Sequence, residues 1–434
     1  MRANPLADRW QRPLIIRSTQ ARLDVIPCDS VKNESKRVAF FPDAYYEVDG
    51  IANTSRQFEA FAKRRGLPFL VIHAGPRNEI VTAGSVTRVQ LRRSRVGFPL
   101  DRAHEYDLLF LRHYRKIAAL VREFAPHVVQ ITGPSDVGTL GTLLAHRLGI
   151  ALAATWQTNL HQYARTRLSA AVSFLPKVCS KKLSGAAERW SFRAMARFYK
   201  IPRLLFAPNP EIINLLENTT GKPCAWMPHG VDTEIFNPKL RDRQTGPFRI
   251  GYVGRLTAEK NVRILARLEG ALTALGHRDF RIVVVGQGAQ ERWLRSNMQR
   301  AEFTGVLTGS ELSRAFANMD AFVFPSETDT FGLAVLEALA SGVPAVVSAG
   351  GGPKYTVQHG QTGYVANNFD EFVALTAVLL THPDLLTSMR IAARQYALST
   401  SWEQVFEGMY KAYEDYLHAA YLFGGRHLGR DEKA

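Results

Sequence analysis

The chain has 434 residues, of which 46% are hydrophobic and 22% are charged, and its net charge is +16. These are values of a globular protein, and the length suggests two to three domains. No apolar run approaches the ~18 residues of a membrane span, and the N-terminus lacks the apolar region of a signal peptide. The sequence has three scattered cysteines, Cys28, Cys179 and Cys224. Their spacing is not that of metal ligands, and an odd number does not suggest a disulfide framework. We therefore expect a cytoplasmic protein with reduced thiols.

The positive charge is confined to one half of the chain. Residues 241–434 contain 20 basic and 20 acidic side chains, whereas residues 1–240 contain 35 and 19. A basic half joined to a neutral half predicts an anionic partner for the first half alone. Nucleic acid and an anionic lipid surface are both candidates. A generally arginine-rich composition does not explain the charge, because it would extend over both halves.

The first half opens with an arginine-containing extension, residues 1–36, whose function is unknown. A short strand at 37–41, a glycine turn, an amphipathic helix and a strand at 67–72 then predict a doubly wound α/β sheet. Gly50 lies in the first strand-to-helix loop, where a phosphate can approach the backbone. Residues 77–104 are basic and are predicted to form a hairpin or a pair of loops. Residues 107–123 are predicted to form a helix with Leu108 and Leu111 facing inward.

A second basic stretch occupies residues 165–203, with ten Lys or Arg side chains against one acid, Glu188. Helical spacing places four cations on one face: Arg189, Arg193, Arg197 and Lys200. Such a helix is typical of contact with an anionic membrane. A solvated charged face over a core helix is the alternative and the more common case. Interleaved aromatics also suit single-stranded nucleic acid, but no recognisable module accompanies them.

The second half begins after a polar linker near 238–247. A strand at 249–253 runs into a loop in which Gly254 permits a tight turn and Arg255 and Lys260 supply two cations. Cations at a strand-to-helix loop suit a diphosphate. The strand 281–285 ends at Gly286, and we interpret the glycines there as a wall of a nucleotide site because G-x-G alone is weak evidence for a dinucleotide fingerprint.

Residues 321–347 form the most informative stretch. A strand (321–325), an acidic loop (326–330), a helix (331–340) and a strand (345–347) predict a parallel crossover. Asp329 and Thr330 are the expected caps. Free amides at the helix start would bind an anion, and the residues concerned are Phe331, Gly332 and Leu333. Glu337 and Asp329 would then flank a phosphate and accept hydrogen bonds from paired hydroxyls. An ordinary strand–helix unit with a capped helix is the alternative.

This stretch, residues 324–344, resembles the signature of family-4 retaining glycosyltransferases, which use nucleotide sugars. The resemblance implies that Asp329, a Glu in many members, contacts the donor sugar and that Glu337 contacts the ribose. It further implies that Arg255 and Lys260 neutralise the leaving diphosphate, and that the loop around Thr304 receives the base.

The family usually has a His where this chain has Gln157. That His contacts the reacting sugar, and Gln can donate and accept hydrogen bonds but cannot exchange protons. His161, four residues later, is therefore a candidate for part of the role. A histidine that bonds locally at a helix start is an equally good interpretation.

The resemblance covers residues 38–420 and implies the GT-B fold, two doubly wound Rossmann-like domains facing across a cleft. The expected acceptor-side domain is 37–240, joined by a terminal helix at 402–421, and the expected donor domain is 241–401. The phrases DGIANTSR and TNLHQYAR look most like lipid mannosyl-, glucosyl- and sulfoquinovosyltransferases.

We therefore expect hexose transfer, with retention, from a UDP-, GDP- or ADP-sugar to a lipid or glycan acceptor. We expect no metal or other cofactor and no nucleic-acid partner. Residues 165–203 would hold the protein peripherally at the inner membrane face. A soluble saccharide acceptor, a GT-B epimerase or phosphorylase, and a basic nucleic-acid-binding protein are the alternatives.

Overall fold

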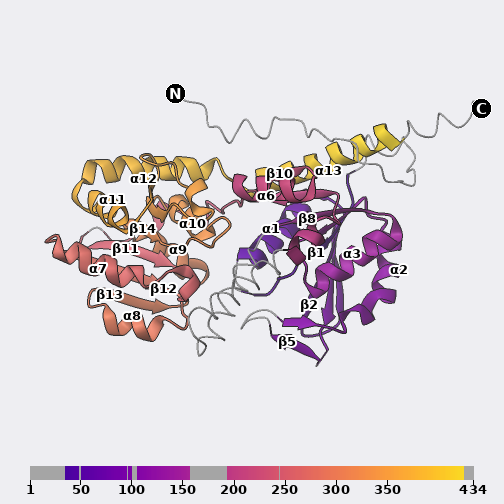
Figure 1. Cartoon of the computed structure of the whole chain (residues 1–434), viewed down its shortest axis with the longest axis horizontal. Coiled ribbons are helices and arrows are strands. Elements are labelled where there is room, and N and C mark those ends of the chain that lie inside the picture. Colours follow the sequence, from indigo (N-terminus) through magenta and orange to yellow (C-terminus); the bar gives the residue numbers. More distant parts are fainter. Residues whose placement is uncertain are drawn as a thin grey trace, which may run out of the picture. The chain divides into compact units, whose positions relative to one another are not determined.

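The computed structural model describes residues 35–47, 50–94, 96–99, 105–156, 193–243 and 245–424. These residues form two compact units (Figure 1). Unit 1 consists of the described residues up to 156, together with 193–228 and 405–424, and unit 2 consists of those from 229 to 404. In the part of the chain described, no single helix has the length and composition of a membrane span, although one bent pair, Phe369–Thr381 with Pro383–Ala420, meets the test across a 101° break.

Unit 1 is built on an eight-stranded sheet in the order β10-β9-β8-β7-β1-β2-β4-β3. Every neighbouring pair is parallel except β3 and β4, which form an antiparallel hairpin. In chain order the strands are β1 Val38–Phe41, β2 Phe69–Gly75, β3 Glu79–Ala83, β4 Val86–Arg92, β7 Val128–Ile131, β8 Ala151–Thr155, β9 Leu204–Ala207 and β10 Cys224–Trp226. A small antiparallel pair, β5 Gly97–Pro99 and β6 Glu105–Asp107, follows β4. The sheet predicted from the apolar runs is therefore confirmed.

Helices complete unit 1. They are α1 Gly50–Arg64, α2 Tyr114–Phe124, α3 Asp136–Leu148, α6 Pro210–Thr220 and the part of α13 (Trp402–Gly424) from Val405 onward. The ring of Phe406 on α13 stacks on Phe58 of α1, with centroids 4.6 Å apart. The Tyr413 hydroxyl donates to Gln130 Oε1 of β7 at 2.9 Å. Helix α13 is thus part of the core of unit 1.

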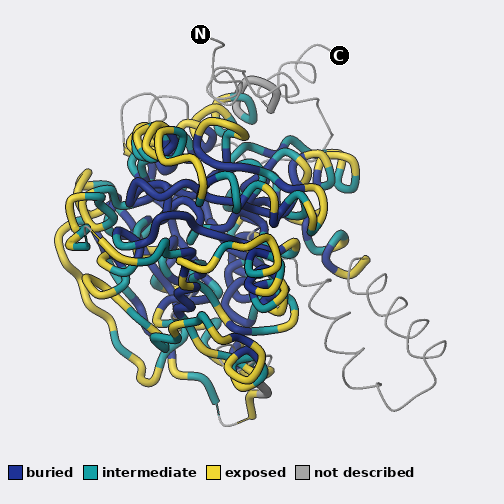
Figure 2. Tube along the Cα trace, turned by 90° about the vertical axis from the view of Figure 1, so that its left-hand side faces the viewer, coloured by how far each residue is buried: buried dark blue, intermediate teal, exposed yellow. Residues whose placement is uncertain are grey.

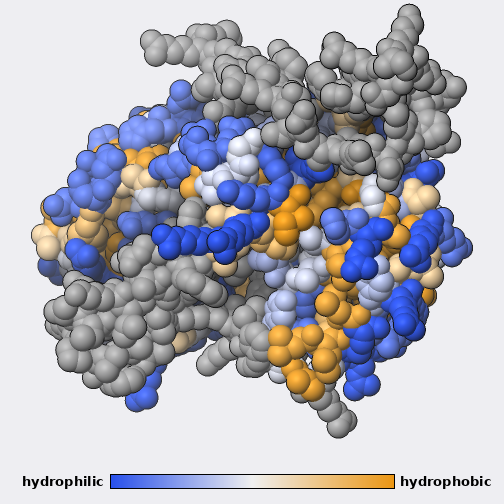
Figure 3. Space-filling view, turned by 45° about the vertical axis from the view of Figure 1, so that its right-hand side comes forward, coloured by the Kyte–Doolittle hydropathy of each residue, from blue (hydrophilic) through white to orange (hydrophobic). Residues whose placement is uncertain are grey.

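The helix predicted over 107–123 is wrong at its start. β6 ends at Asp107, a 3-10 turn η3 covers Phe110–His113, and α2 begins only at Tyr114. The buried Asp107 carboxylate accepts hydrogen bonds from the amides of Ser94 (2.6 Å) and Leu109 (2.8 Å), so the chain turns around it. Leu108 and Leu111 consequently point outward, 63% and 43% exposed. Figure 3 shows apolar side chains gathered low on one face of the molecule.

Unit 2 is built on a six-stranded, fully parallel sheet in the order β13-β12-β11-β14-β15-β16. Its strands are β11 Phe248–Val253, β12 Phe280–Val285, β13 Ala301–Gly305, β14 Ala321–Phe324, β15 Ala345–Ser348 and β16 Gly363–Ala366. Its helices are α7 Ile264–Ala274, α8 Glu291–Asn297, α9 Gly309–Ala317, α10 Leu333–Ala340, α11 Phe369–Thr381 and α12 Pro383–Leu398. The strand order reverses between β11 and β14, and doubly wound sheets bind ligands at such a switch point.

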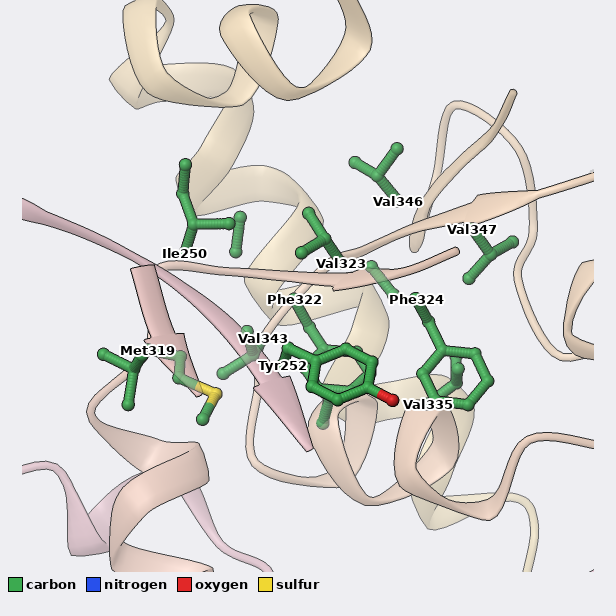
Figure 4. Close-up of a cluster of buried hydrophobic side chains, with 14 of the residues drawn as sticks. Ile250, Tyr252, Met319, Phe322, Val323, Phe324, Val335, Val343, Val346 and Val347 are labelled. Carbon is green, nitrogen blue, oxygen red and sulfur yellow. The ribbon is translucent and has the colours of Figure 1, made fainter. Parts of the chain in front are cut away.

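The strands of unit 2 are nearly continuous apolar runs because helices cover both faces of the sheet. Figure 2 shows the strands buried and the outer sides of the helices exposed. In Figure 4, Tyr252 of β11 and Phe324 of β14 lie beside Val335 of α10. The two rings are stacked at 6.1 Å. This packing connects α10 directly to the two central strands.

The chain passes from unit 1 to unit 2 between Pro228 and His229, whereas the sequence pattern predicts the boundary at 240–241. Residues 229–243 make their contacts in unit 2. Arg241 pairs with Asp320 at 2.6 Å, and the Phe236 ring packs 5.6 Å from that of Phe316. The polar composition that suggested a linker therefore belongs to a segment held by specific hydrogen bonds.

Candidate active site

The loops that follow β11, β12 and β13 touch one another through backbone atoms. The Gly254 amide donates to Val285 O at 3.0 Å, and the Gly286 amide donates to Gly305 O at 2.7 Å. A Cβ on Gly286 would lie 2.0 Å from Gly254 O, and its φ of 131° is one that side chains disfavour. Gly254 itself has a φ of 156°. The two glycines predicted as site residues therefore hold the carboxyl edge of the sheet together.

The structure brings Lys260 and Asp329 into contact. Lys260 ends a short 3-10 turn after β11, and its ammonium forms an ion pair with Asp329 Oδ1 from the loop after β14. Lys260 is 9% exposed. The second oxygen, Asp329 Oδ2, is buried and has no hydrogen-bond partner among the described residues. A buried carboxylate oxygen without a partner is costly, so it is a ready acceptor for a ligand hydroxyl.

Arg255 occupies a different environment from Lys260. Its side chain is half exposed, and its guanidinium lies 3.9 Å from Glu259 Oε1. The Tyr252 hydroxyl donates to Arg255 O at 3.1 Å and fixes the backbone of the loop. Of the two predicted cations, Lys260 is therefore buried and paired, whereas Arg255 reaches solvent.

Helix α10 begins two residues later than predicted. Its N-cap is Gly332, with a φ of 85° and no side-chain cap, so the expected capping by Asp329 and Thr330 is wrong. Val335 N already donates to Gly332 O at 2.9 Å, which leaves the first-turn amides of Leu333 and Ala334 for an anion. The physical reason lies in the loop that follows β15. A Cβ on Gly352 would lie 1.9 Å from Thr330 O, and the Gly352 amide donates to Asp329 O at 2.7 Å.

Phe331 belongs to this loop and not to the helix. Its buried ring packs against the His229 ring at 4.8 Å, and its carbonyl accepts from Thr356 Oγ1 at 3.2 Å. Burial lowers the pKa of His229 to about 4, so this histidine is neutral at physiological pH. Phe331 therefore positions the start of α10 through packing.

Glu337 lies on the second turn of α10 and is partly buried. Burial raises the pKa of its carboxyl to about 8, so the group is mostly protonated at neutral pH. A protonated carboxyl donates one hydrogen bond and accepts others. That combination suits two neighbouring hydroxyls of a ribose.

Comparison with known proteins identifies the kind of site. Residues 48–235 match the model of Glycosyltransferase Family 4, and residues 247–382 match that of Glycosyl transferases group 1. A GDP-mannose-dependent alpha-mannosyltransferase of Mycolicibacterium smegmatis is 32% identical over 69% of this chain and 76% of that protein. The chain belongs to glycosyltransferase family 4.

Two further comparisons agree with this assignment. A sulfoquinovosyl transferase of Arabidopsis thaliana is 27% identical over 85% of this glycosyltransferase and 72% of that protein. Sucrose-phosphate synthase from Thermosynechococcus elongatus has the same fold, with a TM-score of 0.67 at 15% identity over 88% of this chain and all of that one. The protein is a GT-B hexosyltransferase that uses a nucleotide-sugar donor and a glycosyl acceptor, as the sequence predicted.

The other predicted residues of the glycosyltransferase lie at two places. Thr304 is at the carboxyl end of β13, where its hydroxyl donates to Gly305 O at 3.2 Å. Gly50 opens α1 in unit 1, and a Cβ there would meet nothing within 4 Å. Gln157 and His161 lie outside the described residues, so their roles stay predictions.

Unit 1 of the glycosyltransferase contains a polar cluster that the sequence patterns did not predict. Tyr45 stacks on His73 at 4.1 Å, and the Tyr46 hydroxyl donates to Gln90 Oε1 at 2.7 Å. His73 Nε2 and Gln90 Nε2 are buried and have no hydrogen-bond partner in the described ranges. His73 and Gln90 are paired in register on β2 and β4, near the carboxyl edge where ligands bind. The sequence features that could have indicated this cluster are the two tyrosines after β1 and the histidine late in β2.

Proposed function

We propose that this glycosyltransferase transfers mannose from GDP-mannose to a lipid-linked acceptor, with retention and without a metal ion. The observation that carries the proposal is the paired Lys260 and Asp329 beside the start of α10, with one Asp329 carboxylate oxygen that no described residue satisfies. The match to a GDP-mannose-dependent relative favours guanine and mannose. A UDP-sugar, one of the donors that the sequence leaves open, is the second candidate.

In this proposal the chain's own groups stabilise the departing diphosphate. Arg255, Lys260 and the amides of Leu333 and Ala334 supply positive charge and hydrogen-bond donors where negative charge develops. Asp329 Oδ2 accepts from a hydroxyl of the donor sugar, and Glu337 binds the ribose. The acceptor attacks the front face of the sugar, and the departing phosphate takes its proton. Retention is expected from the family resemblance.

We place the protein in the cytoplasm, peripheral to the inner membrane face, with the basic stretch 165–203 among its contacts. Within that stretch residues 193–199 are helical, with Arg193 and Arg197 exposed and Met195 and Tyr199 buried. This arrangement is compatible with both a membrane-facing and a solvated basic face. Vesicle binding by a Lys181→Gln, Lys182→Gln variant distinguishes the two, since a solvated face predicts no change.

A thermal-shift series with EDTA present tests the donor assignment. GDP and GDP-mannose should raise the unfolding midpoint, whereas UDP, ADP and UDP-glucose should not, because a ligand at 100 times its Kd adds about 2.7 kcal/mol of stability. A uridine-specific shift would replace GDP-mannose by the second candidate. A shift that EDTA abolishes would contradict metal independence. Transfer of radiolabelled mannose to a polyprenyl or diacylglycerol acceptor then tests the reaction.

A further inference from the structure

Unit 1 carries a group of exposed aliphatic side chains, the apolar turn surface. Its members are Val96, Leu108, Leu109 and Leu111, which are 58%, 63%, 51% and 43% exposed. Val96 lies beside Leu108 because Gly97 pairs with Asp107 across β5 and β6. Single exposed apolar residues are ordinary, but a gathering of them marks an interaction site.

The fold itself holds these leucines outward. Arg112 donates to the buried Asp107 carboxylate at 2.6 Å, and the Leu109 amide donates to the same group. Phe110, between Leu109 and Leu111, is 1% exposed and fills the core beneath. The buried ring of Phe110 and the buried carboxylate of Asp107 thus hold the turn in place. The leucine side chains of the turn are directed away from the core.

The charge around the apolar turn surface is positive. From Tyr106 to Arg122 the sequence has four Lys or Arg side chains and one acid, and that acid is the buried Asp107. Arg115 and Lys116, in the first turn of α2, are exposed. Glu123, the next acid along the chain, is exposed at the far end of α2, and Asp136 is buried and paired with Arg93 at 2.9 Å. Figure 3 shows hydrophilic side chains bordering the apolar ones on this face.

The apolar turn surface is fixed to the ligand-binding edge of unit 1. Asp136 opens α3, directly after the loop at the carboxyl end of β7. Its Oδ2 accepts from the Asp107 amide at 3.1 Å and from Arg93 Nε at 2.9 Å. A partner held by the leucines therefore lies next to the edge at which doubly wound sheets bind their ligands.

We propose that the apolar turn surface inserts into the headgroup region of an anionic bilayer, with Arg115 and Lys116 on the lipid phosphates. Four aliphatic side chains offer roughly a few hundred Å², below the roughly 1,000 Å² of a stable protein interface. At a bilayer, small apolar gains add to headgroup attraction. The inference rests on the proposed function, because the membrane-bound apolar turn surface would present the lipid acceptor to unit 1.

Sedimentation of the full chain with vesicles tests the inference. The vesicles are phosphatidylcholine alone or phosphatidylcholine mixed with phosphatidylglycerol. Leu108→Glu and Leu109→Glu should each lower the partition coefficient about tenfold or more. Arg115→Gln with Lys116→Gln should lower binding to the mixed vesicles several-fold and weaken its salt dependence. Leu275→Glu is the matched control, since Leu275 is 60% exposed in unit 2, and it should bind like the wild type.

Two results overturn the inference. One is wild-type vesicle binding by Leu108→Glu and Leu109→Glu while Lys181→Gln with Lys182→Gln abolishes binding. The other is a loss of dimer mass in light scattering on Leu108→Glu, which would assign the surface to a second copy of the chain. Absence of GDP-mannose transfer to any lipid, with leucine-dependent vesicle binding intact, would refute the proposed function and leave the membrane surface standing.

Discussion

The two units use the same kind of sheet but finish its carboxyl edge differently. In unit 2, the glycines after β11, β12 and β15 bring backbone against backbone, as at Gly286 and Gly352. In unit 1, a Cβ on Gly138 would lie 2.0 Å from Gly133 O, but these two glycines belong to the one short segment that leads from β7 into α3 and join no separate loops, and Gly50 has open space around it. Both edges keep buried polar atoms without a partner among the described residues, such as Asp329 Oδ2 in unit 2 and His73 Nε2 in unit 1. The donor side is thus tied from loop to loop by backbone contacts, whereas Gly50 on the acceptor side keeps open space beside it.

The largest expected effect tests the donor side. Arg255→Ala and Lys260→Ala should each lower turnover by roughly two to three powers of ten, because each removes charge stabilisation from the leaving diphosphate. Steady-state kinetics with GDP-mannose measures this. Arg281→Ala, an exposed residue at the start of β12, is the control and should be near wild type. Near-normal activity of both site variants would end the assignment of the donor site.

A second test asks whether the carboxyl edge of the unit 2 sheet is stable only with glycine at its close backbone contacts. Gly286→Ala should destabilise the protein by about 3 kcal/mol or more, since its Cβ would lie 2.0 Å from Gly254 O and its φ is positive. Denaturant unfolding measures the change. Gly270→Ala in α7 is the control, because nothing lies within 4 Å there, and a gain of about 0.5–1 kcal/mol is expected. Equal stability of the two variants would contradict the interlocked edge.

Glu337 provides a pH test of unit 2. Its pKa is about 8 in the folded state against an ordinary 4.5, so the folded protein keeps a proton that the unfolded chain releases. Stability should therefore fall as pH rises from about 4.5 to 8 and level off above. Glu337→Gln should remove this component, visible as a smaller drop in Tm, and raise the KM for the donor about tenfold. Parallel Tm profiles for both proteins would show that the carboxyl is not buried as described.

The smallest effect is expected in unit 1. Gly50→Ala should leave Tm almost unchanged, because the new Cβ meets nothing within 4 Å. If a ligand approaches the backbone there, the KM for the acceptor should rise by a few-fold while the KM for the donor stays constant. A fall in Tm as large as that of Gly286→Ala would erase the contrast between the units.

The sequence reveals most of the sheet and much less of the site. Apolar runs such as Val38–Phe41 and Ala321–Phe324 predict strands because both faces of the sheet are covered, so the signal is local. The pairing of Lys260 with Asp329 joins two loops that follow different strands, and spacing along the chain does not contain it. The start of α10 at Leu333 depends on Gly352, which lies in a third loop.

Leu108 and Leu111 show the limit of periodicity. Their spacing fits the buried face of a helix, yet one buried carboxylate, Asp107, turns the chain before the helix begins. Hydrogen bonds of a single acidic side chain override the apolar pattern, and nothing in a local window reveals that Asp107 is buried. The residues that the pattern assigned to the core are those now proposed to meet a membrane.

The membership of α13 in unit 1 has a consequence for biosynthesis. Residues 229–404, which form unit 2, leave the ribosome before Phe406, Tyr410 and Tyr413 are available. Unit 2 can therefore fold during translation, whereas unit 1, although synthesised first, lacks the rings that pack against Phe58 and Phe206 until α13 has been made. The half begun first is therefore completed last, and its core stays incomplete for that interval.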